Sequence, residues 1–267
     1  MTRWFPIVLV LALTAALTFL TLPVVAIFVD SSPAELIDSL GERGATEALW
    51  LSLRTTAAAL AIIVVVGTPA AYLLATRSFR GKAIVVTLIE LPLVLPPAVA
   101  GVALLAAVGP TGLLGDRLEA AGIELSLTTA GVVVALTFVA SPFYVRQAQA
   151  AFGALDPRWL EASRTLGASE ARTFVRVAIP TAAPGLLTGG ALALGRALGE
   201  FGATLMFAGS LAGVTQTAPL AIYERFATDF EDALALSAVL VAVSAGLLLA
   251  VKLAGGRNAM GDAAARG

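Results

Sequence analysis

Residues 55–76 read TTAAALAIIVVVGTPAAYLLAT and contain no charged side chain. About 20 predominantly apolar residues in a helix cross the hydrocarbon core of a bilayer, which is about 30 Å thick. A strand of a membrane barrel would instead alternate polar and apolar residues over a short segment. This stretch therefore predicts a membrane-spanning helix.

The composition of the whole chain supports the same conclusion. Of the 267 residues, 58% are hydrophobic and 13% are charged, whereas soluble domains average roughly 45–50% and 25%. A soluble domain of this size would still expose roughly a quarter of its unfolded surface, which is too much for a chain so apolar. The sequence predicts an integral membrane protein.

Missing residue types exclude several functional classes. The chain has no Cys and no His, so it lacks disulfides, thiol nucleophiles, zinc–thiolate sites and the commonest general base. A net charge of −1 gives no argument for nucleic acid. The step Gly81-Lys82 is followed by Ala83 and does not form a GxxxxGK[ST] phosphate loop. If ATP powers this protein, another chain must bind it.

Six apolar runs are long enough to cross the membrane. We expect an all-α polytopic membrane protein with six transmembrane helices, at Phe5–Val29, Ala48–Thr76, Ala83–Val108, Leu127–Val145, Pro180–Gly209 and Ala233–Leu253. The first run, about 24 residues, is longer than the core of a signal peptide, so we expect it to be retained. The chain then divides into a first helix with an external loop (1–47), a core (48–253) and a short tail (254–267).

The positions of Lys and Arg predict the orientation. Segments on one side of the membrane hold twelve of the 17 basic residues, the alternate segments hold four, and Arg196 lies inside the fifth span. Cytoplasmic loops carry an excess of Lys and Arg. Both termini are therefore predicted to be cytoplasmic.

The longest cytoplasmic segment, 147–179, carries signals for short helices. Asp156 before Pro157 is an N-cap with proline at the first helical position, Gly167 is a stop, and Ser169 starts a second helix. Four residues share one helical face: Trp159, Ala162, Ser163 and Leu166. A docking element for a soluble partner and an ordinary solvated helix fit this pattern equally well.

The spacing inside this segment is more specific. Glu161-Ala162-Ser163 is followed after three residues by Gly167, and nine residues further on by Val177, one residue and Ile179-Pro180. This resembles the EAA loop of bacterial ABC importer permeases: EAA, three residues, G, nine residues, I, one residue, L-P. The departures, Ser163, Val177 and Ile179, are conservative.

The resemblance implies a type I ABC importer permease fold over at least residues 48–253, with this loop docking into a cleft of an ATPase subunit. The residues it implies for ATPase coupling are Glu161, Ala162, Ser163, Gly167, Ile179 and Pro180.

Two further stretches carry a narrower resemblance. Residues 90–101, ELPLVLPPAVAG, open the third span, and residues 195–209, GRALGEFGATLMFAG, close the fifth. Together they resemble the permease subunit of molybdate ABC transporters. Sulfate permeases are similar but usually carry tyrosine and bulkier residues around the Gly-Glu step. The resemblance implies an importer of molybdate, or of the nearly identical tungstate, with a sulfate or thiosulfate importer as the alternative.

The resemblance also implies the surroundings of the chain. The chain itself is expected to bind no cofactor or metal and to have no catalytic residue, while a partner ATPase uses ATP and Mg²⁺. The implied partners are a second copy of the permease, two nucleotide-binding subunits, an external oxyanion-binding protein and membrane lipid, with no nucleic acid. The implied location is the cytoplasmic membrane of a bacterium or archaeon.

Charged residues inside the spans are candidate pathway groups. Arg196 and Glu200 lie four apart on one face of the fifth span, and Glu90 lies early in the third. Charges at membrane depth cost about 2.5–3.5 kcal/mol each on insertion scales, so they usually pair or line a wet cavity. Arg196 could form a structural ion pair with Glu200 or with Glu90, and it could also attract a passing dianion.

Prolines and glycines mark the same two spans. Pro92, Pro96 and Pro97 should kink or break the third span, and broken backbone must lie against protein or water. The fifth span has two GxxxG steps, 185/189 and 195/199, which suit close helix packing or an interface between two copies. The candidate pathway and packing residues are Glu90, Pro96, Pro97, Arg196, Gly199, Glu200, Gly202 and Thr204.

Two other functional classes fit the sequence less well. An intramembrane enzyme would have to work with the Glu90 and Glu200 carboxylates alone, and these have no metal-ligand spacing. A self-contained secondary transporter would be expected to show inverted repeats and would not need a docking loop.

Overall fold

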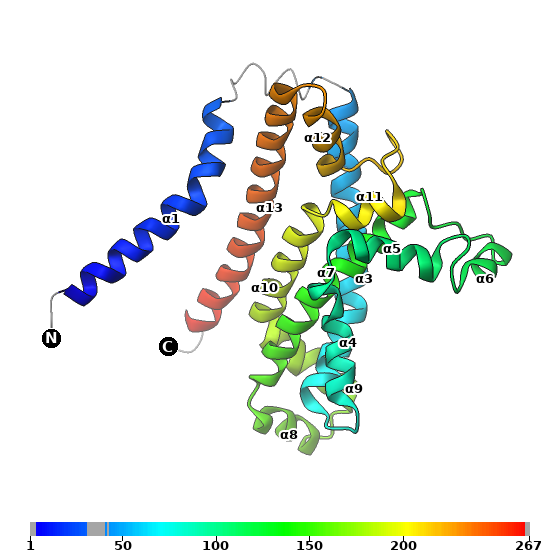
Figure 1. Cartoon of the computed structure of the whole chain (residues 1–267). Coiled ribbons are helices and arrows are strands. Elements are labelled where there is room, and N and C mark those ends of the chain that lie inside the picture. Colours follow the sequence, from blue (N-terminus) through cyan, green and yellow to red (C-terminus); the bar gives the residue numbers. More distant parts are fainter. Residues whose placement is uncertain (1–3, 31–40, 42, 265–267) are drawn as a thin grey trace.

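The computed structural model describes the backbone of residues 4–30, 41 and 43–264. Throughout these ranges the regular structure is helical (Figure 1). The helices are α1 (Trp4–Asp30), α3 (Arg43–Thr76), α4 (Lys82–Val94), α5 (Pro97–Val108), α6 (Gly115–Ala120), α7 (Thr129–Gly153), α8 (Pro157–Thr165), α9 (Glu170–Thr173), the π-helix η1 (Phe174–Ala178), α10 (Ile179–Leu198), α11 (Gly202–Ala208), α12 (Ala218–Phe226) and α13 (Phe230–Ala264).

By length and composition, six segments of the described chain are suited to cross a membrane when the bent pair α4–α5 is counted as one span. Five are single stretches that contain α1, α3, α7, α10 and α13. The sixth is α4 with α5, which are bent by 119° at their junction. The predicted all-α fold with six spans is confirmed, and so is the predicted break in the third span.

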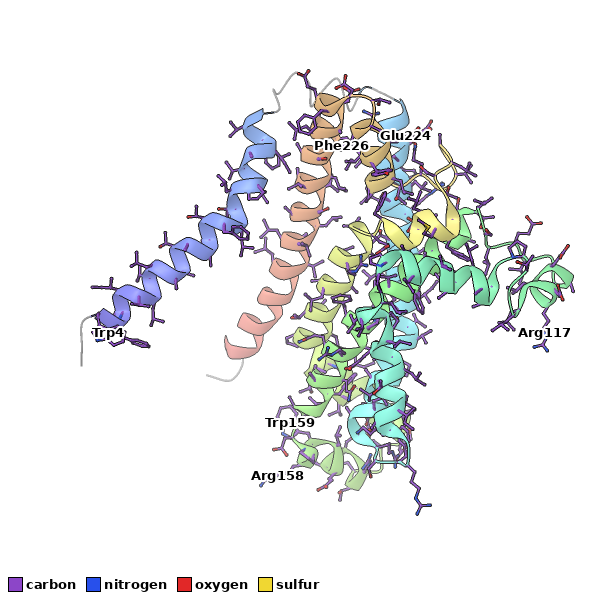
Figure 2. All side chains as sticks on the ribbon, viewed as in Figure 1. Trp4, Arg117, Arg158, Trp159, Glu224 and Phe226 are labelled. Atoms are coloured by element: carbon purple, nitrogen blue, oxygen red, sulfur yellow. The ribbon has the colours of Figure 1, made fainter. Side chains whose placement is uncertain are left out.

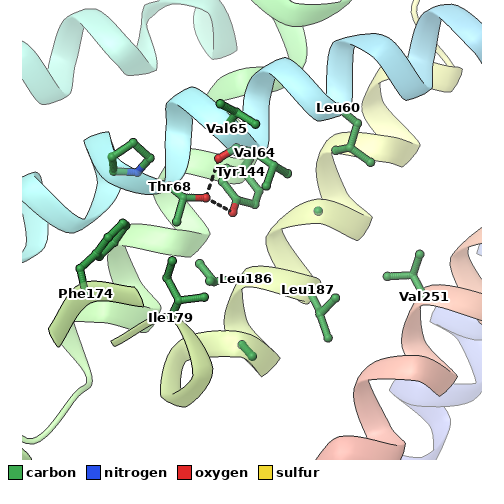
Figure 3. Close-up of a pocket in the computed structure, with 13 residues that line it drawn as sticks. Leu60, Val64, Val65, Thr68, Tyr144, Phe174, Ile179, Leu186, Leu187 and Val251 are labelled. Atoms are coloured by element: carbon green, nitrogen blue, oxygen red, sulfur yellow. Dashed lines mark hydrogen bonds between the residues drawn. The ribbon is translucent and has the colours of Figure 1, made fainter. Parts of the chain in front are cut away.

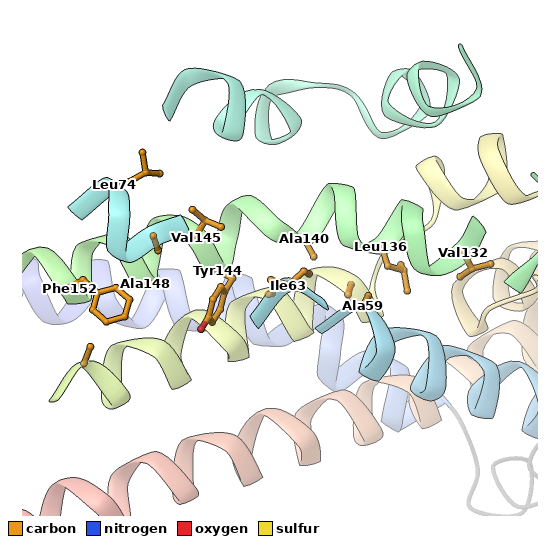
Figure 4. Close-up of a cluster of buried hydrophobic side chains, with 14 of the residues drawn as sticks. Ala59, Ile63, Leu74, Val132, Leu136, Ala140, Tyr144, Val145, Ala148 and Phe152 are labelled. Atoms are coloured by element: carbon orange, nitrogen blue, oxygen red, sulfur yellow. The ribbon is translucent and has the colours of Figure 1, made fainter. Parts of the chain in front are cut away.

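Helix α7 is the centre of the bundle and packs against both α3 and α10. Figure 4 shows the buried side chains that join them, which include Ile63 of α3 and Leu136 and Phe152 of α7. Alanines dominate this cluster, and a β-carbon on Gly67 of α3 would lie 3.0 Å from the Tyr144 ring. The backbones approach closely because small residues line the contact.

Helix α1 stands away from the bundle in Figure 1, and none of its apolar stretch is buried. It contacts α13, which packs on α10 and α12. The start of α1, helix α8 and the end of α13 lie toward one end of the molecule, and α12 lies at the other. Every residue of α8 is therefore at the end from which the first span starts.

Several predicted boundaries were wrong. Helix α7 continues past Val145 to Gly153, because Arg146 ends the apolar run without ending the helix. The fifth span is not one helix over Pro180–Gly209, since α10 ends at Leu198 and α11 begins at Gly202. The candidate span in α13, Phe230–Val251, agrees closely with the predicted Ala233–Leu253, and the helix itself continues to Ala264. Much of the predicted external loop, residues 31–40 and 42, lies outside the described residues, as does Arg3.

Candidate functional site

Helix α8 begins as its sequence predicts. The Asp156 carboxylate accepts a hydrogen bond from the backbone N–H of Arg158 at 2.9 Å, and Pro157 is the first helical residue. This satisfies one of the free N–H groups at the helix start, while proline has none to satisfy.

Helix α8 ends in a glycine turn. The backbone N–H of Gly167 donates to the Arg164 carbonyl at 2.9 Å, and that of Ala168 donates to the Ser163 carbonyl at 3.1 Å. This pair of bonds is the Schellman motif, which places the residue after the helix in the left-handed region. Gly167 has φ of +80°, and a β-carbon there would meet no atom within 4 Å. Glycine is required here because of the positive φ, since a side chain would have enough room.

One face of α8 is open and the other is tied to the bundle. Glu161 and Ala162 are exposed, as is Trp159, which Figure 2 places with Arg158 at the edge of the molecule. Ser163 is half-buried, and its hydroxyl bonds the Thr173 hydroxyl of α9 at 3.0 Å. The predicted coupling residues thus divide into an outward-facing pair and an anchor.

Contacts behind α8 fix the loop to the membrane helices. Arg77, just after α3, pairs with Glu170 of α9 at 2.6 Å. The Tyr72 ring of α3 lies 4.7 Å from Phe174 and 5.3 Å from Phe152, measured between ring centroids. The loop is therefore held by an ion pair and an aromatic cluster.

The loop continues directly into α10. The π-helix η1 joins α9 to α10 without a break in helical backbone. Ile179 packs against the central cluster, and Pro180 lies in the first turn of α10. Helices α9, η1 and α10 therefore form one continuous helical segment behind α8.

The two glycine- and proline-rich stretches pack against each other. A β-carbon on Gly202 of α11 would lie 2.7 Å from the Pro97 β-carbon at the start of α5. A β-carbon on Gly101 of α5 would lie 2.6 Å from the Met206 β-carbon and 2.7 Å from the Ala203 carbonyl oxygen. The broken third and fifth spans meet at this contact, which sequence spacing could not reveal.

Glu200 holds the break in the fifth span together. Only 1% of its side chain is exposed; one carboxylate oxygen accepts the Ala203 N–H at 2.7 Å, and the other pairs with Arg196. Of the two partners left open for Arg196, Glu200 is the one in the structure. The arrangement caps α11 and neutralises a partly buried charge.

The remaining candidates of this group surround the same break. Gly199 follows the last residue of α10, and Pro96 precedes the first residue of α5. Thr204 of α11 is fully buried, and its hydroxyl has no hydrogen-bond partner among the described residues. These residues shape the contact between α5 and α11.

Glu90 lies apart from that break and pairs with Arg146 of α7 at 3.1 Å. Arg146 was not among the predicted pathway residues, because the first charge after an apolar run has the same pattern as the end of a span. The two side chains line an open polar groove of about 330 Å³ between α4 and α7.

A second groove, of about 720 Å³ and mostly apolar, lies beside α3 and α10 (Figure 3). Its polar lining atoms satisfy one another: the Thr68 hydroxyl lies 2.6 Å from the Tyr144 hydroxyl and also donates to the Val64 carbonyl. Without spare donors from these groups, this groove is poorly suited to an anion.

The first GxxxG step packs inside the chain. A β-carbon on Gly189 would lie 3.1 Å from the Gln147 β-carbon, and one on Gly185 would overlap Ala151, both on α7. A β-carbon on Gly195 would make only ordinary contact with Leu248 of α13. The α7 contact explains the first step without a second copy of the chain.

Comparison with known proteins identifies the family. Residues 65–254 match the protein family described as "Binding-protein-dependent transport system inner membrane component". This chain belongs to that permease family. The permease is 43% identical to the molybdenum transport system permease protein ModB of Mycobacterium tuberculosis, over 89% of this chain and 90% of the relative. It is 38% identical to ModB of Escherichia coli K12, over 68% and 80%.

A solved structure confirms the fold of the permease. This structure is a chain of a bacterial ABC transporter involved in the import of the acidic polysaccharide alginate. The two chains align with a TM-score of 0.76 and 16% sequence identity, over 95% of this chain and 96% of the other. At this identity the likeness establishes the type I importer permease fold alone. The permease is thus a multi-pass membrane protein and a transport subunit.

Proposed function

We propose that the chain is the permease subunit of an ATP-driven molybdate importer. The observation that carries the proposal is the outward-facing α8, placed between two spans with the EAA-like spacing, in a chain 43% identical to a ModB protein over most of its length. Tungstate is chemically close enough to share the pathway, and sulfate is the alternative substrate.

The proposed complex contains two copies of this chain, two ATPase subunits and an external oxyanion-binding protein. One chain offers one α8, while two ATP sites form between two nucleotide-binding subunits. A cyclic two-fold is the commonest way to supply a second loop. In this assembly the chain itself binds no cofactor and has no catalytic residue, and the partner ATPase subunits bind Mg²⁺ and hydrolyse ATP. Native mass measurement that found one permease copy would contradict the dimer.

We place α8 and both termini in the cytoplasm, on the excess of basic residues at that end. The chain has no cysteine, so single-cysteine variants give a clean test. Arg158→Cys should react with an impermeant maleimide only in inside-out vesicles, and Glu224→Cys, at the other end in Figure 2, only in right-side-out ones. The reverse pattern would overturn the orientation.

The contacts suggest how ATPase movement reaches the pathway. Force on the open face of α8 passes through the Ser163–Thr173 bond and η1 into α10. Helix α10, about 30 Å long from its 20 residues, ends at the Glu200 break where α11 meets α5. Closing two α8 elements toward each other would then shift the contact between the broken spans.

Uptake measurements test the substrate. Proteoliposomes containing the permease, its ATPase and its binding protein should accumulate radiolabelled molybdate only with ATP. Unlabelled tungstate should compete, and sulfate should compete weakly. Uptake of sulfate in place of molybdate would reject the proposed substrate and retain the importer.

The coupling role of α8 has a matched control. Gly167→Val should uncouple ATP hydrolysis from uptake or weaken ATPase binding, because valine strongly disfavours φ of +80° and the helix end would turn differently. Gly122→Val imposes the same strain at φ of +70°, also with no atom within 4 Å, but beyond α6. Glu161→Lys should act like Gly167→Val. Normal coupled uptake in both α8 variants would discard the role.

A further inference from the structure

The groove between α4 and α7 gathers four polar side chains from two helices. Lys82 and Glu90 line it from α4, about two turns apart, and Arg146 and Gln149 line it from α7, three residues apart. Apolar side chains such as Val86 complete the wall. The groove, about 330 Å³, has room for a tetrahedral oxyanion with water around it.

The charged pair in this groove is open although it lies within membrane-spanning segments. The side chains of Glu90 and Arg146 are 34% and 60% exposed, and both helices belong to candidate spans. Charges facing lipid within a span cost up to about 2.5–3.5 kcal/mol each on insertion scales, the value at the centre of the bilayer. The groove is therefore expected to face water or protein and not hydrocarbon.

Most hydrogen-bond donors in the groove are spare. Arg146 forms an ion pair with Glu90, with its Nε 3.1 Å from a carboxylate oxygen, and the two terminal amino groups of the guanidinium are left for a ligand. Lys82 donates to the Arg77 carbonyl at 3.1 Å and has two further N–H groups. Within the described residues the Gln149 amide makes no side-chain hydrogen bond. Two cations and one carboxylate give the groove a net charge of +1.

We propose that this groove is an oxyanion-binding site at the α8 end of the translocation pathway. This inference rests on the proposed function, which supplies a tetrahedral dianion. The Arg146 fork donates two parallel bonds to its oxygens, Lys82 adds a point charge, and Gln149 donates a third contact. Glu90 positions Arg146 through the ion pair, and its own charge weakens anion binding so that the ion can leave.

Equilibrium binding of radiolabelled molybdate to the purified permease–ATPase complex, without the binding protein, tests the site. Arg146→Gln should weaken binding about tenfold or more, and Lys82→Gln and Gln149→Leu should weaken it less. Glu90→Gln should tighten binding about threefold, because it removes a negative charge from the groove. It should also slow uptake at saturating binding protein, since release becomes harder.

The opposite signs separate a binding site from a structural ion pair. A purely structural pair predicts that Arg146→Gln and Glu90→Gln lower the Tm together and change molybdate binding alike, and that result would overturn the proposal. Arg80→Gln is the matched control, because it removes one exposed basic charge near the start of α4 but outside the groove. An equal loss of binding in this control would also overturn the proposal. So would a wild-type complex that imports molybdate but shows no molybdate binding.

The uptake assay keeps this test apart from the proposed function. If wild-type complex imports another oxyanion and no molybdate, the proposed substrate fails. The same variant panel measured with the imported oxyanion then decides the groove on its own. Unchanged binding across that panel would reject the site.

Discussion

The third span and the predicted fifth span are interrupted by different means. Between α4 and α5, Leu95 and Pro96 are extended and Pro97 starts the next helix, so the backbone lacks the N–H groups that would continue α4. Between α10 and α11 no proline intervenes, and the Glu200 carboxylate takes the place of the missing helix acceptor for Ala203. The first break is local, while the second depends on one buried side chain and its partners.

The largest effect is expected where the break depends on that side chain. Glu200→Leu should destabilise the protein by about 3–5 kcal/mol, because Arg196 would keep a partly buried charge without its partner. Thermal unfolding in detergent should show a strongly lowered Tm or little monodisperse protein. Glu90→Gln, which breaks the more exposed pair with Arg146, should cost about 1 kcal/mol or less. Equal losses in the two variants would remove the distinction between them.

The contact between the two breaks is the next most sensitive feature. Gly101→Ala should cost about 1–3 kcal/mol, because the new methyl group meets the Ala203 backbone oxygen, which cannot turn away. Gly190→Ala in α10, where no atom lies within 4 Å, should be neutral or slightly stabilising. Denaturant or thermal unfolding of the two variants should differ in sign or by at least 1 kcal/mol, roughly. A neutral Gly101→Ala would show that the contact is loose.

Removing one proline from the first break should matter less. Pro97→Ala restores an N–H in the first turn of α5, a position where helices leave that group free. Pro96 and the packing of α5 on α11 remain, so the change in unfolding free energy should stay within about 1 kcal/mol. The Tm of this variant should therefore lie well above that of Glu200→Leu. A larger loss would mean that Pro97 alone maintains the break.

The smallest effect is expected at Thr204. Its buried hydroxyl has no partner among the described residues, so replacing it with a methyl group in Thr204→Val removes an unsatisfied polar atom. Stability should be unchanged or should rise by about 1 kcal/mol. A clear fall in Tm would indicate a partner for this hydroxyl in the assembled transporter.

Some residues could be assigned from the sequence because their chemistry is local. Asp156 and Pro157 start α8 and Gly167 ends it as predicted, since capping and φ above zero depend on neighbours in the chain. The predicted ends of α7 and α10 were wrong, because hydropathy alone does not show where a helix ends. Hydropathy treats Arg146 as a boundary and the stretch over Gly199 and Glu200 as continuous, although a helix can carry a charge and an apolar run can break.

The sequence by itself determined the membrane environment, the number of spans and the start and end of α8, because apolar length and chain-local turns need no distant partner. Only the tertiary structure decided that Arg196 pairs with Glu200, that Arg146 pairs with Glu90, and that Gly202 packs on Pro97. A charge at membrane depth must find a partner, but the sequence offered several within reach. The packing of α4 on α7 and of α5 on α11 made the choice, because it fixes which side chains come within bonding distance.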